Sequence, residues 1–162
     1  MYPYLVITKV VPIVAIAPIL AIWFGFGTTP KIVVAFLIAF FPIVVNLVLG
    51  FRSPDKGMLM LMRSMNAREV DTFRKIRIPY AMPYFFAALR IAAPTCVVGA
   101  IVAEFVGSDS GLGYVILFAK GYLQTNLIFL AVVASALLGI LMFGAVVVVE
   151  ARVLRWHESH AA

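Results

Sequence analysis

Charged residues, cysteine and histidine are all scarce in this chain. Of its 162 residues, 12% are charged and 64% are hydrophobic, whereas a soluble domain is about 25% charged and about 45–50% apolar. A soluble fold of this size needs a mostly polar surface, so this composition excludes a soluble globular enzyme and a disordered tail. The single cysteine, Cys96, excludes a disulfide scaffold, and we interpret it as a packing residue. The sequence is that of an integral membrane protein.

The residue sets that carry chemistry are missing as well. His157 and His160 stand in a polar tail without acidic partners, and zinc needs three or four ligands, so we predict no metal site. Gly25 and Gly27 lack the Lys-Ser/Thr that follows a phosphate-binding loop. The sequence also shows no set of a nucleophile, a histidine and an acid that would suggest a catalytic site. We therefore predict no enzyme activity, no catalytic residue and no cofactor.

Four apolar stretches have the length that crosses a hydrocarbon core, about 20 residues. They cover residues 4–26, 32–51, 83–106 and 127–149, and prolines interrupt them at Pro12, Pro18, Pro42 and Pro94. A shorter stretch, residues 114–122, predicts an interfacial or partly inserted helix. The prediction is an all-α polytopic membrane helix bundle with about four transmembrane helices, in a single domain over residues 1–162.

The positive charges are unevenly distributed. The chain has 13 Lys and Arg against 7 Asp and Glu, a net charge of +6, and the loop at residues 52–82 holds the largest share. Arg152 and Arg155 follow the last span, whereas Lys31 and Lys120 are isolated on the other side. The positive-inside rule therefore places the 52–82 loop and the C-terminus in the cytoplasm. The charge predicts topology and contact with membrane lipid, with no nucleic-acid partner.

A positive residue also lies within the third span. Arg90 stands about two turns into it, and we expect its long side chain to extend back to the cytoplasmic interface.

The 52–82 loop has the pattern of two short helices. Residues 58–65 are strong helix formers and hold four of the seven methionines. Asn66 suits the turn that follows, because Asn tolerates the left-handed conformation. A second helix is expected from Glu69 to about Ile78, with Pro79 and Pro83 marking the start of the third span. Methionine-rich helices suit docking to a partner and packing against the bundle equally well, so both interpretations stay open.

The far end of the third span carries an acid and a glycine-rich segment. An ionisable residue within a span is a functional hypothesis by default, and Glu104 has two interpretations: a gating contact or loop anchor, or a residue beside the substrate path. Gly111 and Gly113 fit a tight turn or re-entrant backbone. Neighbouring Asp109 and Ser110 also fit plain turn chemistry. We take Glu104, Gly111 and Gly113 as candidate pathway or gate residues.

Three motifs in the loop resemble a known family. They are Arg63-Ser64-Met65-Asn66-Ala67-Arg68, Thr72-Phe73-Arg74-Lys75-Ile76-Arg77-Ile78-Pro79 and Ala81-Met82-Pro83. Together they resemble the EAA loop of permeases of bacterial ATP-binding-cassette (ABC) importers. That pattern has an acid-Ala-Ala, a glycine four residues after the last Ala, and a hydrophobic-x-hydrophobic-Pro ending. Measured back from Pro79, the glycine falls on Asn66 and the acid-Ala-Ala on Met60-Leu61-Met62, where this chain departs from the pattern.

The resemblance covers nearly the whole chain. The segments Leu89-Arg90-Ile91-Ala92, Val102-Ala103-Glu104-Phe105-Val106-Gly107 and Gly111-Leu112-Gly113-Tyr114 are similar to the nitrate, sulfonate and taurine branch of these permeases, which includes riboflavin and thiamine-precursor importers. Upstream, Trp23-Phe24-Gly25-Phe26-Gly27 and Phe40-Phe41-Pro42 match the same branch.

The resemblance implies a permease subunit in the bacterial plasma (inner) membrane. Such a subunit forms the path for a small organic or anionic solute of the sulfonate, nitrate, taurine, pyrimidine or riboflavin type. Its implied partners are a cytoplasmic ABC ATPase, an extracytoplasmic substrate-binding protein and a second permease copy in a homodimer. The implied ATPase-coupling residues are Met62, Arg63, Ser64, Asn66, Ala67, Phe73, Arg74 and Pro79.

Two alternatives accompany this interpretation. The chain could be a membrane scaffold that transports nothing, or an inactive truncated permease fragment. Family members carry about two more spans upstream, each of about 20 residues, so we expect this chain to lack upstream helices.

Overall fold

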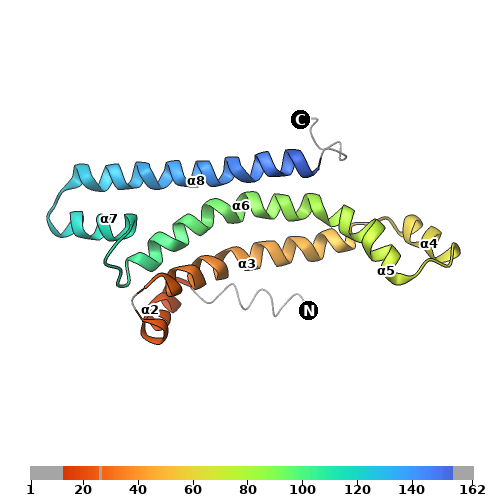
Figure 1. Cartoon of the computed structure of the whole chain (residues 1–162), viewed down its shortest axis with the longest axis horizontal. Coiled ribbons are helices and arrows are strands. Elements are labelled where there is room, and N and C mark those ends of the chain that lie inside the picture. The colour runs from red at the N-terminus through yellow and green to blue at the C-terminus, as the bar shows by residue number, and fades with distance from the viewer. Residues whose placement is uncertain (1–12, 26, 155–162) are drawn as a thin grey trace.

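The described part of the chain is helical throughout (Figure 1). A computed structural model describes residues 13–25 and 27–154. The elements are α2 (Ile13–Phe24), α3 (Thr28–Arg52), α4 (Lys56–Ser64), α5 (Glu69–Thr72), the π-helical turn η1 (Phe73–Arg77), α6 (Ile78–Glu104), α7 (Leu112–Gly121) and α8 (Thr125–Val153). The predicted all-α membrane bundle is confirmed, and residues 114–122 fall almost entirely in the short helix α7.

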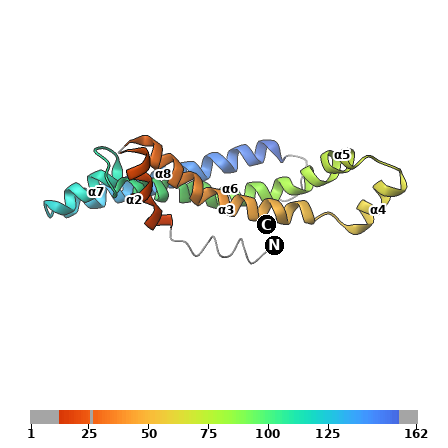
Figure 2. The ribbon, with the colours of Figure 1, turned by 90° about the horizontal axis from the view of Figure 1, so that it is seen from below.

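Three long helices form the body of the molecule. α3, α6 and α8 run side by side, with α6 in contact with both of the others (Figures 1 and 2). Small residues allow the close approach of α3 and α6. A Cβ added at Gly50 would lie 2.8 Å from the Cα of Ala81, and one added at Gly99 would lie 2.5 Å from the Cδ1 of Ile38.

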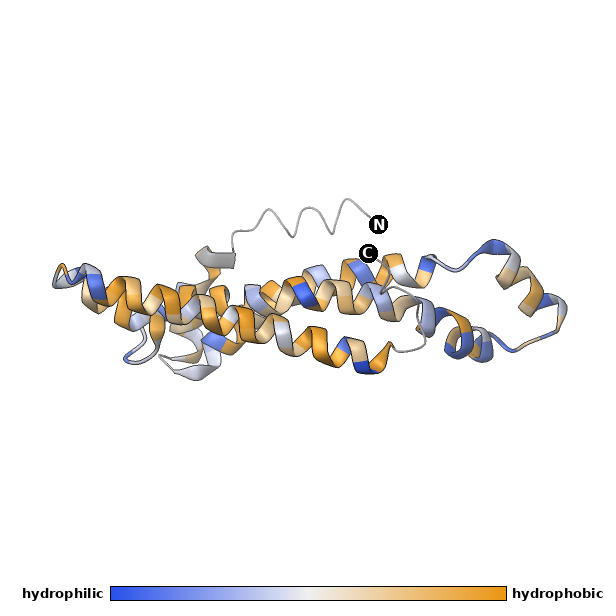
Figure 3. Cartoon of the chain, turned by 90° about the horizontal axis from the view of Figure 1, so that it is seen from above, coloured by the Kyte–Doolittle hydropathy of each residue, from blue (hydrophilic) through white to orange (hydrophobic). Residues whose placement is uncertain are grey.

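The two ends of this body differ. α4 and α5 form a hairpin (residues 56–72) that projects from one end, whereas α2 and α7 lie at the other (Figure 2). Figure 3 shows apolar residues along the three long helices and polar residues concentrated in the hairpin.

Three helices are long and apolar enough to cross a membrane. They run over Thr28–Arg52, Glu69–Glu104 and Thr125–Val153, and they overlap the second, third and fourth expected spans. The first expected span, residues 4–26, lies partly outside the described residues, and its described part is the shorter apolar helix α2. Large apolar side chains of α8 such as Leu137 and Leu141 are exposed, which suits contact with lipid or with other helices.

The second hairpin helix and the third span, which we expected as two helices, join without a break. Helical structure runs without a break from Glu69 to Glu104 through α5, η1 and α6. Pro79 occupies the first turn of α6, where a missing N–H costs least, and Pro83 is accommodated inside the helix. Pro18, Pro42 and Pro94 likewise lie inside continuous helices, whereas Pro12 lies outside the described residues. The span and the second hairpin helix are therefore one continuous helical element.

Candidate functional site

The hairpin is closed by a backbone turn at Asn66. Its φ is 51°, in the left-handed region, as the sequence predicts for this position. The Ala67 N–H donates to the Met62 carbonyl and the Asn66 N–H to the Arg63 carbonyl, each at 3.0 Å. This pair of bonds ends α4 as a Schellman motif, which commonly uses Gly or Asn at the left-handed position. The predicted left-handed turn is confirmed, and it brings Met62, Arg63, Asn66 and Ala67 together.

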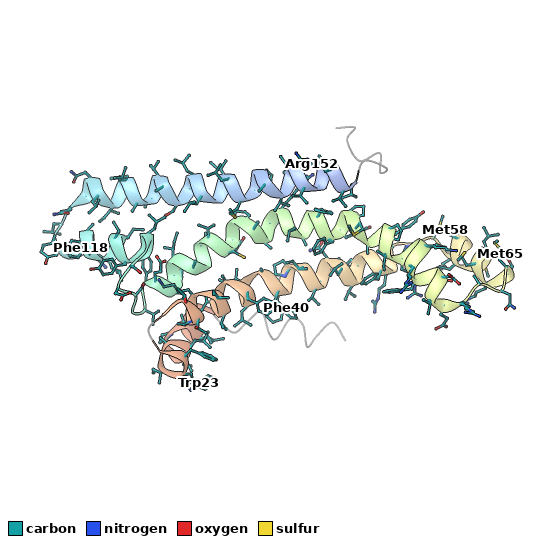
Figure 4. The ribbon with its side chains drawn as sticks, in the orientation of Figure 1. Trp23, Phe40, Met58, Met65, Phe118 and Arg152 are labelled. Carbon is teal, nitrogen blue, oxygen red and sulfur yellow. The ribbon has the colours of Figure 1, made fainter. Side chains whose placement is uncertain are left out.

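The first hairpin helix stands away from the bundle. α4 contains no buried residue, and Met58 and Met65 lie at the free end of the molecule (Figure 4). The Ser64 hydroxyl donates to the Leu61 carbonyl at 2.8 Å and so belongs to the helix end. The interpretation in which α4 folds back on the bundle does not hold, and its methionines remain open to a partner.

The two hairpin helices enclose a hollow of ≈ 420 Å³. Apolar and charged side chains both line it, and three of them, Arg63, Ala67 and Phe73, belong to the predicted coupling set. Glu69, Thr72 and Arg77 complete its polar part.

The base of the hairpin is anchored to α3. The rings of Phe73 and Phe51 lie 5.5 Å apart between centroids, and Ile76 is buried. Arg74, in the same π-helical turn, is exposed, and Pro79 follows in the first turn of α6. The hairpin is therefore joined to α6 through its backbone and to α3 through an aromatic contact.

A second polar group of residues lies at the other end of α6. The Glu104 carboxylate accepts the Gly113 N–H at 2.7 Å through Oε2, and its Oε1 lies 3.5 Å from the Lys31 ammonium. That ammonium also donates to the Ser110 carbonyl at 3.1 Å. The side chains of Lys31 and Glu104 are 19% and 13% exposed. This Lys31–Glu104 cluster ties α3, α6 and the start of α7 together.

The two candidate glycines are fitted to Glu104. Gly111 has a φ of 117°, which L side chains rarely adopt, and a Cβ there would overlap the Glu104 carboxylate. A Cβ at Gly113 would lie 2.6 Å from the Ile101 carbonyl oxygen and 2.8 Å from the Glu104 Cβ. Glu104, Gly111 and Gly113 therefore form one packed unit.

The structure adds a residue that sequence reasoning did not single out. Nε of Arg90 donates to Oε2 of Glu150, and the two side chains are 39% and 10% exposed. Arg90, which we expected to extend toward the cytoplasmic interface, is paired across α6 and α8. Glu150 directly follows the predicted fourth span. Arg90 and Glu150 carry opposite charges near the same ends of two predicted spans, and this pattern could have identified Glu150 from the sequence.

No group of three or more His, Cys, Asp or Glu that could hold a metal occurs in the described residues. His157 and His160 lie outside them.

A family comparison now adds to this geometry. Residues 1–155 match the model of the binding-protein-dependent transport system inner membrane component. The chain belongs to that family. It is a multi-pass inner-membrane protein of the ABC permease type, and the resemblance noted from its motifs is confirmed.

Individual permeases of this family are similar over most of the chain. It is 40% identical over 129 residues to a probable ABC transporter permease protein of Haemophilus influenzae, which covers 80% of this chain and 53% of the relative. It is 35% identical to a formylaminopyrimidine transport permease protein of Halalkalibacterium halodurans, covering 98% of this chain and 63% of the relative. It is 34% identical to a riboflavin transport system permease protein of Chloroflexus aurantiacus, covering 97% and 59%. The chain thus spans little more than half the length of these permeases.

Proposed function

We propose that this chain acts as the permease subunit of an ABC importer and performs no bond chemistry itself. The observation that carries the proposal is the hairpin, which buries no residue in its first helix and continues without a break into a membrane-length helix. A rigid element of this kind can pass a movement at its exposed end into the span. A cytoplasmic ATPase would supply that movement by binding the hairpin.

The residues of the hairpin divide into two roles under this proposal. Exposed groups, among them Arg63, Ser64 and Arg74, are available to the ATPase. Asn66 and Phe73 hold the hairpin in shape, through the left-handed turn and the contact with Phe51. Met62 and Ala67 form a backbone hydrogen bond that ends α4, and Pro79 lies in the first turn of α6.

Orientation and partners follow from the charge distribution. The hairpin end carries most of the positive residues, so we place the hairpin and the C-terminus in the cytoplasm. The opposite end, with α7 and the Lys31–Glu104 cluster, then faces a substrate-binding protein. We also propose that two copies form the transporter, since exposed apolar side chains such as Phe36 on α3 and Phe129 on α8 offer surface for a second copy.

For the solute, we propose the range set by the relatives. Permeases named for formylaminopyrimidine, riboflavin and aliphatic sulfonates are all similar to this chain. A small organic or anionic solute is therefore the proposed cargo, which would also admit nitrate and taurine.

For Glu104 we favour the role of a loop anchor or gating contact. Its carboxylate already accepts a backbone N–H and faces the Lys31 ammonium. A group satisfied in this way fixes the position of α7 and is less available to a passing solute.

The test is co-purification of the tagged chain with the ATPase subunit of the same transporter. Arg74→Glu reverses an exposed charge beside the hairpin, and we expect it to remove most of the bound ATPase while α6 stays helical. Phe73→Ala should weaken binding by loosening the hairpin from Phe51. Lys120→Glu, the same kind of change on exposed α7, is the matched control and should change nothing. Equal ATPase binding in Arg74→Glu and Lys120→Glu would contradict docking of the ATPase on the hairpin.

A further inference from the structure

The Arg90–Glu150 pair joins two spans inside apolar sequence. Glu150 is the single buried charged residue among the described residues. Four valines, Val146 to Val149, precede it, and Leu89 and Ile91 flank Arg90. A lone carboxylate or guanidinium in such surroundings is costly, so the two opposite charges stabilise each other's burial.

The pair lies where little else holds α8. Within α8 the buried residues are Ala131 near its start and Glu150 near its end, and Leu154 just beyond the helix is also buried. The most apolar 18-residue window of α8 has none of its residues buried. Between these two ends, an apolar groove of ≈ 440 Å³ opens between α6 and α8, lined by residues that include Pro94, Ser135 and Gly139.

The two ends of α8 are therefore held differently. At its start, α8 is connected to α6 through α7, which also packs against it. At the hairpin end no chain connection joins α8 to α6 within the described residues, and the Arg90–Glu150 pair bridges them. A charge-assisted hydrogen bond holds its two groups in a defined geometry, whereas two apolar surfaces can slide along each other.

We propose that the Arg90–Glu150 pair is a clasp that makes the end of α8 move with α6. Arg90 and Glu150 are then positioning residues for transport, an inference that rests on the proposed function. Movement of the hairpin enters α6 directly, because α5, η1 and α6 are one continuous helical element. The clasp passes that movement to α8, whose apolar contacts with α6 leave an open groove beside them. Without this ion pair, α6 tilts and the end of α8 does not move with it.

The experiment measures the distance between α6 and α8 directly. Spin labels are placed at exposed Ala87 and Val148, in a Cys96→Ala background, in the full chain assembled with its ATPase in lipid nanodiscs. Distance distributions are recorded by pulsed electron paramagnetic resonance without nucleotide and with ATP and vanadate. We expect one narrow distribution that is the same in both states. Glu150→Gln should broaden it, and the charge swap Arg90→Glu with Glu150→Arg should restore it.

A matched control and a transport readout complete the test. Arg152→Gln removes an exposed charge from the same end of α8 and should leave the distribution unchanged (Figure 4). Glu150→Gln should lower solute uptake per ATP hydrolysed by about tenfold, within the usual range of coupling between sites, with ATP hydrolysis retained. The swap should recover uptake, which a general loss of stability would not predict.

Three results would overturn the clasp. The first is a narrow distance distribution in Glu150→Gln. The second is a charge-swap variant that fails to fold or to restore the wild-type distance. The third is a wild-type distance that changes between nucleotide states. Failure of the proposed function can be told apart from failure of the clasp. It would appear as absence of ATPase binding to the wild-type chain, whereas the distances measured without nucleotide would still report on the Arg90–Glu150 pair.

Discussion

At the scale of single residues, backbone conformation decides what several positions tolerate. Asn66 and Gly111 both have positive φ, 51° and 117°, but for different reasons. Asn66 ends a helix, where Asn is an accepted alternative to Gly. Gly111 must also leave room for the Glu104 carboxylate. Gly113 has the same steric demand without a positive φ, so its identity is fixed by neighbouring atoms.

Gly113→Ala should destabilise the protein. The added Cβ would lie 2.6 Å from the Ile101 carbonyl oxygen, and this backbone atom cannot rotate away. We expect a loss of about 1–3 kcal/mol, as for overpacked interiors, measured by thermal unfolding of the detergent-purified chain. Gly121→Ala in the same helix, with nothing within 4 Å of the added Cβ, is the control and should be neutral or slightly stabilising. Equal stability of the two variants would contradict the packed arrangement around Glu104.

At the scale of elements, the π-helical turn η1 sets how the hairpin is oriented on its span. A π-helical turn accommodates an extra residue within a helix and often occurs at functional sites. Here it lies at Phe73–Arg77, between the hairpin and α6, with Ile76 buried and Lys75 exposed. The rotation of the hairpin about the α6 axis therefore depends on the number of residues in this turn.

Insertion of one alanine after Lys75 should separate ATPase binding from helix integrity. A residue added beyond the one that the π-helical turn already accommodates rotates everything before it by about 100° relative to α6, since an α-helix has 3.6 residues per turn. We expect the ATPase to be lost from the purified chain, while circular dichroism shows unchanged helix content. Lys75→Ala is the control, because the Lys75–Asp71 pair is 3.9 Å long and 73% and 47% exposed, so it contributes little. Retained ATPase after the insertion would mean that the orientation of the hairpin does not matter.

At the scale of the whole molecule, the bundle has a polar end and an end held by internal contacts. The hairpin carries exposed charges, whereas at the other end Lys31 and Glu104 are largely shielded from solvent in a shared cluster. The positive-inside rule applied to this difference predicts that the hairpin end faces the cytoplasm.

Cysteine labelling should reveal that orientation. In a Cys96→Ala background, a cysteine at exposed Asp109 should react with a membrane-impermeant maleimide added to intact spheroplasts. A cysteine at exposed Ser64 should react only after the membrane is permeabilised. The reverse pattern would invert the topology and place the hairpin away from any cytoplasmic ATPase.

Much of the fold could be predicted from local pattern, and the misses have physical causes. Hydropathy located the three long helices, because crossing a membrane requires a long apolar run. The turn at Asn66 followed from the tolerance of one residue type. The continuity of the second hairpin helix with the third span was not expected, and it is possible because proline is well accommodated in the first turn of a helix, where Pro79 lies. Glu150 was missed because its partner Arg90 lies 60 positions away in the chain, so the pairing shows only when the charges at the ends of two spans are compared.

By itself, the sequence determined that this is a helical membrane protein, which end of it is positively charged, and the family of its motifs. These properties depend on composition and local spacing. The tertiary structure alone decided that Glu104 meets Lys31 and Gly113, that Phe73 meets Phe51, and that Arg90 meets Glu150. Such contacts depend on the rotation and relative height of packed helices, which are set by close approach at small residues such as Gly50 and Gly99 rather than by the residues that make the contacts.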